Sequence, residues 1–158
     1  MENGSERCRG RERHAAGAMI VVDASVMVSI LRISDAFHEV SRQWLAQHLD
    51  AGDTLAAPTL LVSEVAGAIS RDTGDAQFGR QAIQWLQALP ELTLFPMDTS
   101  LDTLAADAAT DLGLRGADAY YVALAIQQEL PLVIWDRQQR ERSAQRITAQ
   151  SPAMLLQK

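Results

Sequence analysis

Short apolar runs alternate with longer segments of helical period along most of the chain. Four runs have the length and composition of buried strands: Met19–Val22, Leu55–Ala57, Leu92–Phe95 and Leu132–Trp135. Between and after them, apolar residues recur at intervals of three and four, which predicts helices over residues 25–31, 35–49, 58–71, 76–89, 100–112, 118–128 and 137–143. Pro58 is expected in the first turn of its helix, and Ile147–Thr148 as a last edge strand.

This order of elements, with two helices between most strands, predicts an α/β fold. We expect one domain over residues 19–158, with a mostly parallel central sheet of four or five strands and helices on both faces. Residues 1–18 carry four arginines, three glutamates and no large apolar residue after Met1. We expect them to be a disordered extension, with Met19 as the natural start; a basic arm that binds nucleic acid is the alternative.

Composition restricts the chemistry that the chain can perform. Lys158 is the sole lysine and Cys8 the sole cysteine among 158 residues, which excludes a P-loop lysine, a Schiff-base lysine and a cysteine-based zinc site. Carboxylates are abundant, with 20 Asp+Glu and a net charge of −6. The chain has no secretory signal and no run of about 18 apolar residues, so we expect a cytoplasmic protein without a membrane segment.

Two aspartates directly follow predicted strands. Asp23 comes after Met19–Val22, and Asp136 comes after Leu132–Trp135. Ligands of parallel α/β sheets bind at the carboxyl ends of the strands, so both side chains are expected at the same rim. Either aspartate alone is also explained as the N-cap of the following helix.

Two further carboxylates interrupt apolar helices. Glu64 has Leu60 and Leu61 one turn before it, and no basic residue three or four positions away. An unpaired charge in such surroundings costs several kcal/mol, so Glu64 is a candidate site residue, unless it lies on a narrow exposed stripe with Ser63. Asp118 begins a similar apolar helix, where the helix dipole or Arg115 would also explain a carboxylate.

The four acids are more informative together than singly. Carboxylates that face one another in a partly buried pocket repel, and a hard divalent ion such as Mg²⁺ is their natural counter-charge. Such sites activate water and neutralise a phosphodiester during hydrolysis.

At these residues the sequence resembles the PIN-domain ribonucleases, and specifically the VapC-type toxins of toxin–antitoxin pairs. The resemblance spans nearly all of residues 19–148. It is carried by four segments in order: Val21–Ser25, Pro58–Val65, Arg115–Ala125 and Leu132–Arg137.

The resemblance implies a site of Asp23, Glu64, Asp118 and Asp136 that binds Mg²⁺ or Mn²⁺ and cleaves RNA. Ser25 matches a hydroxyl residue that supports the first acid. The resemblance also implies a homodimer and a cognate antitoxin that inserts an arginine into the acidic pocket.

One position departs from the family pattern, because Ile134 stands where a Thr or Ser usually precedes the fourth acid by two residues. The alternative is therefore a catalytically weak PIN-like module that binds RNA or protein; a phosphatase or a DNA-directed nuclease is a third possibility. Arginines outside the pocket, Arg115 among them, are candidates for holding phosphates. We interpret the aromatic residues as core or interface rather than as stacking platforms for bases.

Overall fold

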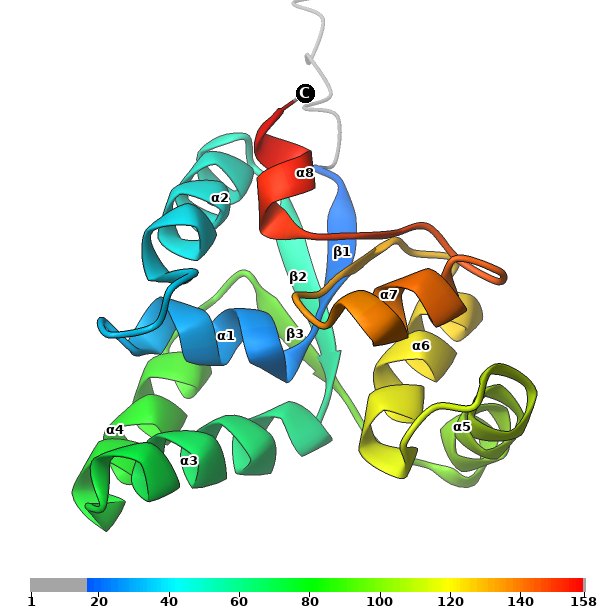
Figure 1. Cartoon of the computed structure of the whole chain (residues 1–158), viewed down its shortest axis with the longest axis horizontal. Helices are drawn as coiled ribbons and strands as arrows, with labels where there is room; N and C mark the ends of the chain where they lie inside the picture. The colour runs from blue at the N-terminus through cyan, green and yellow to red at the C-terminus, as the bar shows by residue number, and fades with distance from the viewer. Residues whose placement is uncertain (1–16, 158) are drawn as a thin grey trace, which may run out of the picture.

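The computed structural model describes residues 17–157, and the predicted disorder of residues 1–18 falls almost wholly outside this range. The described chain forms five strands: β1 (Met19–Val22), β2 (Thr54–Pro58), β3 (Leu92–Phe95), β4 (Leu132–Val133) and β5 (Ala149–Gln150). It also forms eight helices: α1 (Ala24–Leu31), α2 (His38–Asp50), α3 (Leu60–Thr73), α4 (Ala76–Gln87), α5 (Thr99–Leu112), α6 (Gly116–Gln128), α7 (Arg137–Ser143) and α8 (Pro152–Leu156). Figure 1 shows their arrangement.

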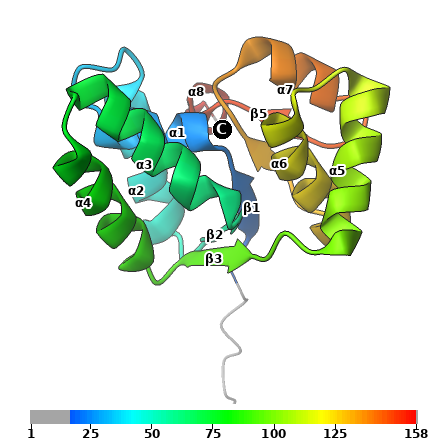
Figure 2. The same ribbon diagram turned by 90° about the horizontal axis from the view of Figure 1, so that it is seen from below.

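The strands form one sheet in the order β3-β2-β1-β4-β5, and every neighbouring pair is parallel. The chain builds outward from β1 to β2 and β3, then returns through α5 and α6 to place β4 on the other side of β1. Because crossovers between parallel strands are right-handed, this reversal puts successive helices on opposite faces. Figure 2 shows α1–α4 on one side of the sheet and α5 and α6 on the other. The predicted α/β class and parallel sheet are confirmed.

The core lies between the sheet and these two layers of helices. β1 and β2 are buried along most of their length, as expected for parallel strands covered on both faces. Helix α6 packs against β1, β2 and β4, and the side chains from Tyr121 to Ala125 are all buried. This central helix carries Asp118 and Tyr121 into the interior. No helix among residues 17–157 is both long enough and apolar enough to cross a membrane.

The sequence-based prediction was wrong at Pro58 and at the carboxyl end of the chain. Pro58 is the last residue of β2, and α3 begins at Leu60. It pairs with Phe95 of β3 and lies two residues beyond Ala56, the last β2 residue that pairs with β1, so its missing N–H costs no bond of the β1 ladder. The final strand lies at Ala149–Gln150 rather than at Ile147–Thr148, because the Ile147 N–H is used by a turn to Ser143.

Helix α8 was not predicted. It has only five residues, too few to show a period, and it is defined by a cap: Ser151 accepts a hydrogen bond from the Met154 N–H, with Pro152 in the first turn.

Helices α3 and α4 approach closely at Gly79, which generates a test of the packing. A Cβ there would lie 2.8 Å from the Ala66 carbonyl oxygen, so Gly79→Ala must push the helices apart. We expect it to lower the free energy of unfolding by roughly 1–3 kcal/mol, although alanine favours helix. Gly116→Ala is the control, because a Cβ there meets nothing within 4 Å. Equal urea midpoints for the two variants would contradict this packing argument.

Candidate acidic site at the carboxyl ends of β1 and β4

Asp23 and Asp136 follow two strands that are neighbours in the sheet. β1 and β4 are neighbours, and the strand order reverses between them. Asp23 directly follows β1, and Asp136 lies three residues beyond the end of β4. In open α/β sheets, this switch point at the carboxyl ends is where ligands bind. The fold therefore puts both predicted aspartates at the expected rim.

Asp23 is the most buried of the four acids, with 6% of its surface exposed. Its Oδ2 accepts the Ser25 backbone N–H at 2.8 Å and caps α1. Burial raises the pKa of Asp23 to about 7; hydrogen bonds from Ser25 oppose this rise, and the charges of Asp118 and Glu64 add to it. Because it is buried, this carboxyl group keeps its proton to a higher pH than an exposed aspartate does.

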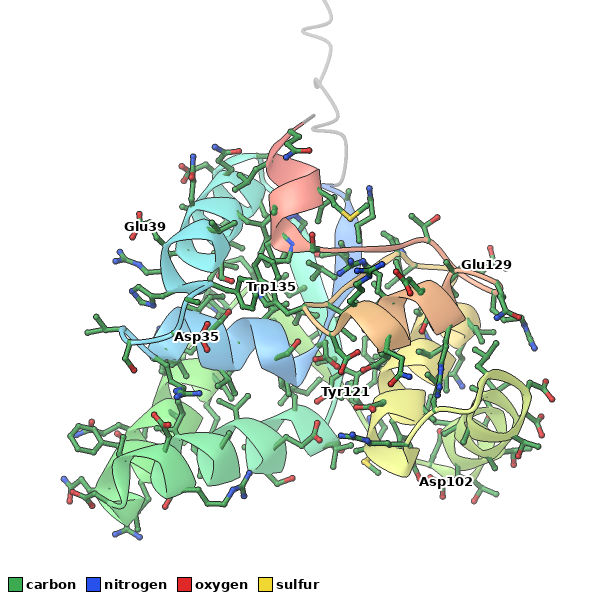
Figure 3. All side chains as sticks on the ribbon, in the orientation of Figure 1. Asp35, Glu39, Asp102, Tyr121, Glu129 and Trp135 are labelled. Atoms are coloured by element: carbon green, nitrogen blue, oxygen red, sulfur yellow. The ribbon has the colours of Figure 1, made fainter. Side chains whose placement is uncertain are left out.

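Glu64 is half-buried on α3 and is held by a tyrosine from the central helix. The Tyr121 hydroxyl donates a hydrogen bond to Glu64 Oε2 at 2.5 Å. Burial raises the pKa of Glu64, the Tyr121 hydrogen bond lowers it, and the charge of Asp118 raises it further. Figure 3 shows Tyr121 where α1, α3 and α6 come together.

Asp118 lies in the first turn of α6 and is also half-buried. Burial raises its pKa, the Arg115 guanidinium lowers it, and the charge of Asp136 raises it. Asp136 itself is exposed and caps α7, because its Oδ1 accepts the Gln139 N–H at 2.8 Å. The buried side chain of Gln139 also donates to the Asp118 carbonyl at 3.2 Å, which ties α7 to α6.

A hydroxyl network joins the ends of β1 and β4 beneath the acids. The Trp135 backbone N–H donates to Ser25 Oγ at 3.2 Å, and the Trp135 indole donates to Ser41 Oγ at 2.8 Å. The hydroxyls of Ser41 and Ser29 share a hydrogen bond of 2.7 Å. Ser25 thus contacts Asp23 through its backbone and fixes the segment that carries Asp136 through its side chain.

The N-cap interpretation of the two strand-end aspartates is confirmed, and it is compatible with a role for both in the site. Asp23 and Asp136 are N-caps; the charge of Asp118 also raises the pKa of Asp23, and the charge of Asp136 raises the pKa of Asp118. Glu64 is not on an exposed stripe with Ser63, since it is half-buried and hydrogen-bonded. Ile134, the departure from the family pattern, is fully buried in the core.

Sequence reasoning missed Tyr121 and Gln139. Tyr121 lies three residues after Asp118, hence on the same helix face, within a helix that is otherwise apolar. A buried tyrosine hydroxyl needs a polar partner, and this was the available signal. Gln139 gave no comparable signal, because its partner depends on how α7 meets α6. The aromatic residues are not uniformly internal either: Phe37 and Phe78 are about half exposed, and Phe37 stacks on Trp135 with ring centroids 4.0 Å apart.

The donor set suits a hard divalent cation. It consists of carboxylate oxygens; burial and the charges of other acids raise the pKa values of Asp23, Glu64 and Asp118, and Arg115 is the cation that acts on Asp118. Among residues 17–157, no three His, Cys, Asp or Glu side chains are arranged as a ready-made cage. Mg²⁺ does not need one, because it keeps several waters and binds through one or two carboxylates. Asp23, Glu64, Asp118 and Asp136 therefore fit such an ion through their chemistry.

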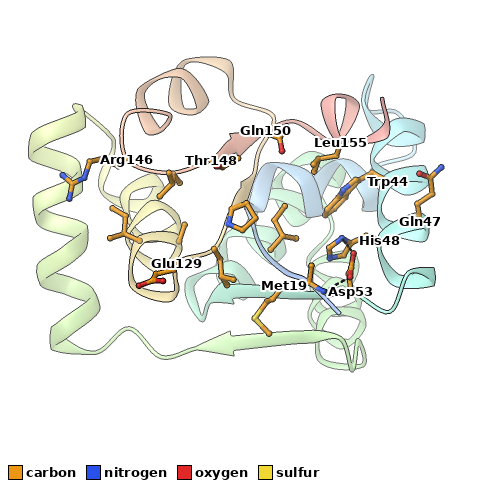
Figure 4. A pocket seen from close by; sticks show the side chains of 17 residues that line it. Met19, Trp44, Gln47, His48, Asp53, Glu129, Arg146, Thr148, Gln150 and Leu155 are labelled. Atoms are coloured by element: carbon orange, nitrogen blue, oxygen red, sulfur yellow. Dashed lines mark hydrogen bonds and ion pairs between the residues drawn. The ribbon is translucent and has the colours of Figure 1, made fainter. Parts of the chain in front are cut away.

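A hollow of about 820 Å³ opens away from the acids, at the amino-terminal ends of the strands (Figure 4). Its walls include Trp44 and His48, whose rings stack with centroids 5.3 Å apart, and Asp53, whose Oδ2 lies 3.6 Å from His48 Nδ1. None of the four predicted acids lines it. Its size alone does not make it the site of the acidic chemistry.

Comparison with known proteins identifies a family for this chain. A model of the PIN domain matches residues 20–144. The fold is similar to that of VapC20 from Mycobacterium tuberculosis, described as a sarcin-ricin loop cleaving toxin, with a TM-score of 0.69, 15% identity and coverage of 82% of this chain and 96% of that chain.

FitAcB from Neisseria gonorrhoeae gives a TM-score of 0.66 at 19% identity, covering 85% of this chain and 99% of that chain. VapBC2 from Rickettsia felis, bound to a promoter DNA fragment, gives a TM-score of 0.65 at 12% identity, covering 84% of this chain and 98% of that chain. No curated protein matches the sequence. At these identities, the solved structures show a shared fold.

The bond from Tyr121 to Glu64 generates the first test of the site. Tyr121→Phe removes the donor and leaves a partly buried carboxylate with one partner fewer, so we expect a loss of about 1 kcal/mol in the free energy of unfolding at neutral pH. Tyr120→Phe is the matched control, since the Tyr120 hydroxyl bonds Asp102 at the surface at 2.7 Å. Urea unfolding of both variants measures the difference, and an equal loss in the two would contradict a special role for Tyr121.

The raised pKa of Asp23 generates a test of pH dependence. A carboxyl group with a raised pKa binds its proton more tightly in the folded state, so the free energy of unfolding falls as the pH rises from the unfolded value of 3.8 to about 7. Asp23→Asn keeps the α1 cap and removes this titration. In EDTA, we expect the variant to gain stability over wild type between about pH 5 and pH 8. A difference between the two proteins that does not change with pH would show that Asp23 titrates normally.

Proposed function

The chain belongs to the PIN domain family, and from this membership we propose that it is a metal-dependent endoribonuclease that acts as the toxin of a toxin–antitoxin pair. One observation carries the proposal. Four carboxylates from four separate elements act on one another electrostatically near the switch point of the sheet, and the pKa values of three of them are raised. Such an arrangement costs stability in the isolated protein and supports binding of a cation.

The four acids have distinct proposed tasks. Asp23, Glu64 and Asp118 are the principal ligands of Mg²⁺, with Mn²⁺ as a substitute, and the exposed Asp136 completes the set on the solvent side. A bound ion of this kind lowers the pKa of water and neutralises charge on a phosphodiester. Tyr121 positions Glu64 through its hydrogen bond, and Ser25 and Gln139 position the segments that carry Asp136 and Asp118. Arg115, beside Asp118, is placed to contact a substrate phosphate.

The proposed partners follow from family membership and from the charge of the site. Similar folds occur in complexes described as VapBC and FitAB, so we propose a cognate antitoxin for this chain. An acidic pocket with raised pKa values is suited to an arginine, whose guanidinium pairs strongly with carboxylates. A homodimer is proposed on the same family basis, and large apolar side chains are available on the surface: Ile33, Phe37, Phe78, Met97 and Met154.

One observation favours the second candidate, a PIN-like module that binds RNA or protein with little turnover. Glu64 and Asp136 are each already engaged in a hydrogen bond, and the described residues hold no ready-made metal cage. Binding of Mg²⁺ without cleavage of any single-stranded RNA in a broad panel would support the module over the nuclease.

The nuclease proposal is tested by RNA cleavage with Mg²⁺ and with EDTA. We expect wild type to cleave single-stranded RNA only with the metal, and Asp118→Asn to lower the rate by at least about 100-fold, because it removes one carboxylate ligand. Asp107→Asn on the exposed face of α5 is the matched control and should cleave as wild type does. Full activity of Asp118→Asn would exclude the assigned site, and preference for duplex DNA would favour a DNA-directed nuclease.

A further inference from the structure

Two separate hollows are lined in part by the acids, one by Glu64 and the other by Asp118 and Asp136. The first, between α1 and α3, is about 460 Å³; its lining runs from Ser25 and Glu64 to Arg71. The second is small and polar, and its lining includes Asp118, Asp136 and Arg115. Each hollow therefore has site carboxylates at one end and an arginine among its lining residues. A strand that enters one hollow and leaves by the other crosses the acids.

Arg71 differs from most other arginines of the described chain in having no polar partner. Its guanidinium forms no hydrogen bond or ion pair with any of residues 17–157, although the adjacent Asp72 is paired with Arg32 at 2.6 Å. Arg137 is paired with Glu141 at 2.7 Å, and Arg146 with Asp111 at 3.3 Å. Arg71 thus keeps its full donor capacity inside a hollow that also contains Glu64.

A glycine one turn earlier gives the Arg71 side chain its place. A Cβ at Gly67 would lie 3.0 Å from Arg71 Nη1, so the guanidinium folds back over the bare backbone of Gly67. Gly67 lies three residues after Glu64, about 4.5 Å further along the helix axis. The guanidinium of Arg71 is exposed to solvent, but it lies back along α3 over Gly67, in the direction of Glu64, and not beyond the end of the helix.

We propose that the groove between α1 and α3 holds the RNA strand on one side of the scissile phosphate, and that Arg71 binds a backbone phosphate there. The proposal rests on the nuclease function and adds the direction in which the substrate leaves the acids. An acidic protein needs local cations to hold a polyanion, and a planar guanidinium with free donors suits a phosphate. The apolar floor of Ala24, Val28 and Ala68 leaves room for the sugar and base. Arg71 is a positioning residue, since it contacts the substrate away from the reacting atoms.

The test measures binding of a single-stranded RNA in the Asp118→Asn background at several salt concentrations, with Mg²⁺ present. Arg71→Ala should weaken binding about tenfold and reduce the slope of log K against log salt by about 0.7, the value for one phosphate contact to a single strand. Arg42→Ala on the exposed surface of α2 is the matched control and should change neither quantity. An unchanged salt slope in Arg71→Ala would overturn the proposal. This would hold even if the same variant were inhibited less strongly by an antitoxin, because Arg71 would then bind protein and not RNA.

Gly67→Ala tests the placement of the charge without removing it. The new methyl group displaces the far end of a flexible side chain and raises helix propensity, so the fold is retained. We expect KM for RNA cleavage to rise several-fold with kcat little changed, and Arg71→Ala to add nothing further in this background. A Gly67→Ala protein with wild-type KM would show that the groove does not position Arg71 for the substrate.

RNA with single methylphosphonate linkages separates this proposal from the nuclease function. If wild type fails to cleave any RNA, the proposed function is wrong. If wild type cleaves, one neutral linkage on one side of the scissile phosphate should lower affinity for wild type about tenfold and have no effect on Arg71→Ala. Equal effects on both proteins at every linkage would overturn the role of Arg71 while leaving the nuclease function in place.

Discussion

The burial of several carboxylates close together, with their mutual repulsion added to it, is the constraint on which the rest of this structure depends. The sheet topology brings Asp23 and Asp136 to one rim, while α3 and α6 bring Glu64 and Asp118 to the same place. Burial raises the pKa of three of these groups, so their ionised forms lower the stability of the metal-free protein, and other contacts have to offset this cost. The parts that do so are small: one tyrosine, one glutamine and a short network of serines around Trp135.

Much of the architecture could be predicted from the sequence, because the spacing of apolar residues matches the buried face of most helices and strands. β1 and β3 have the predicted bounds, and the acids that follow β1 and β4 were placed at the right rim by strand order alone. The errors occur where local signals were weak or ambiguous. Pro58 was compatible with a helix start and with a strand end, and its place in β2 depends on its pairing with Phe95 of β3, which is 37 residues away in the sequence.

The candidate site could be predicted only in part, for a related reason. A carboxylate in an apolar helix can be recognised from the sequence, since its apolar neighbours along the chain indicate that its charge is costly. The partner that offsets this cost is not visible, because Tyr121 lies 57 residues from Glu64 and Gln139 lies 21 from Asp118. Arg71 shows the same limit: its free guanidinium and its fold over Gly67 are properties of the helix surface and the groove.

The double use of Asp23 and Asp136 as caps and as site residues has a consequence for how this lineage can change. A mutation that replaces either one by an apolar residue also leaves the start of α1 or α7 uncapped, so selection for folding protects these positions even where activity is no longer needed. Glu64 and Asp118 have no such protection, because neither of them caps a helix. Inactive descendants should therefore retain a capping side chain, Asp or Asn, at positions 23 and 136, while positions 64 and 118 accept apolar residues.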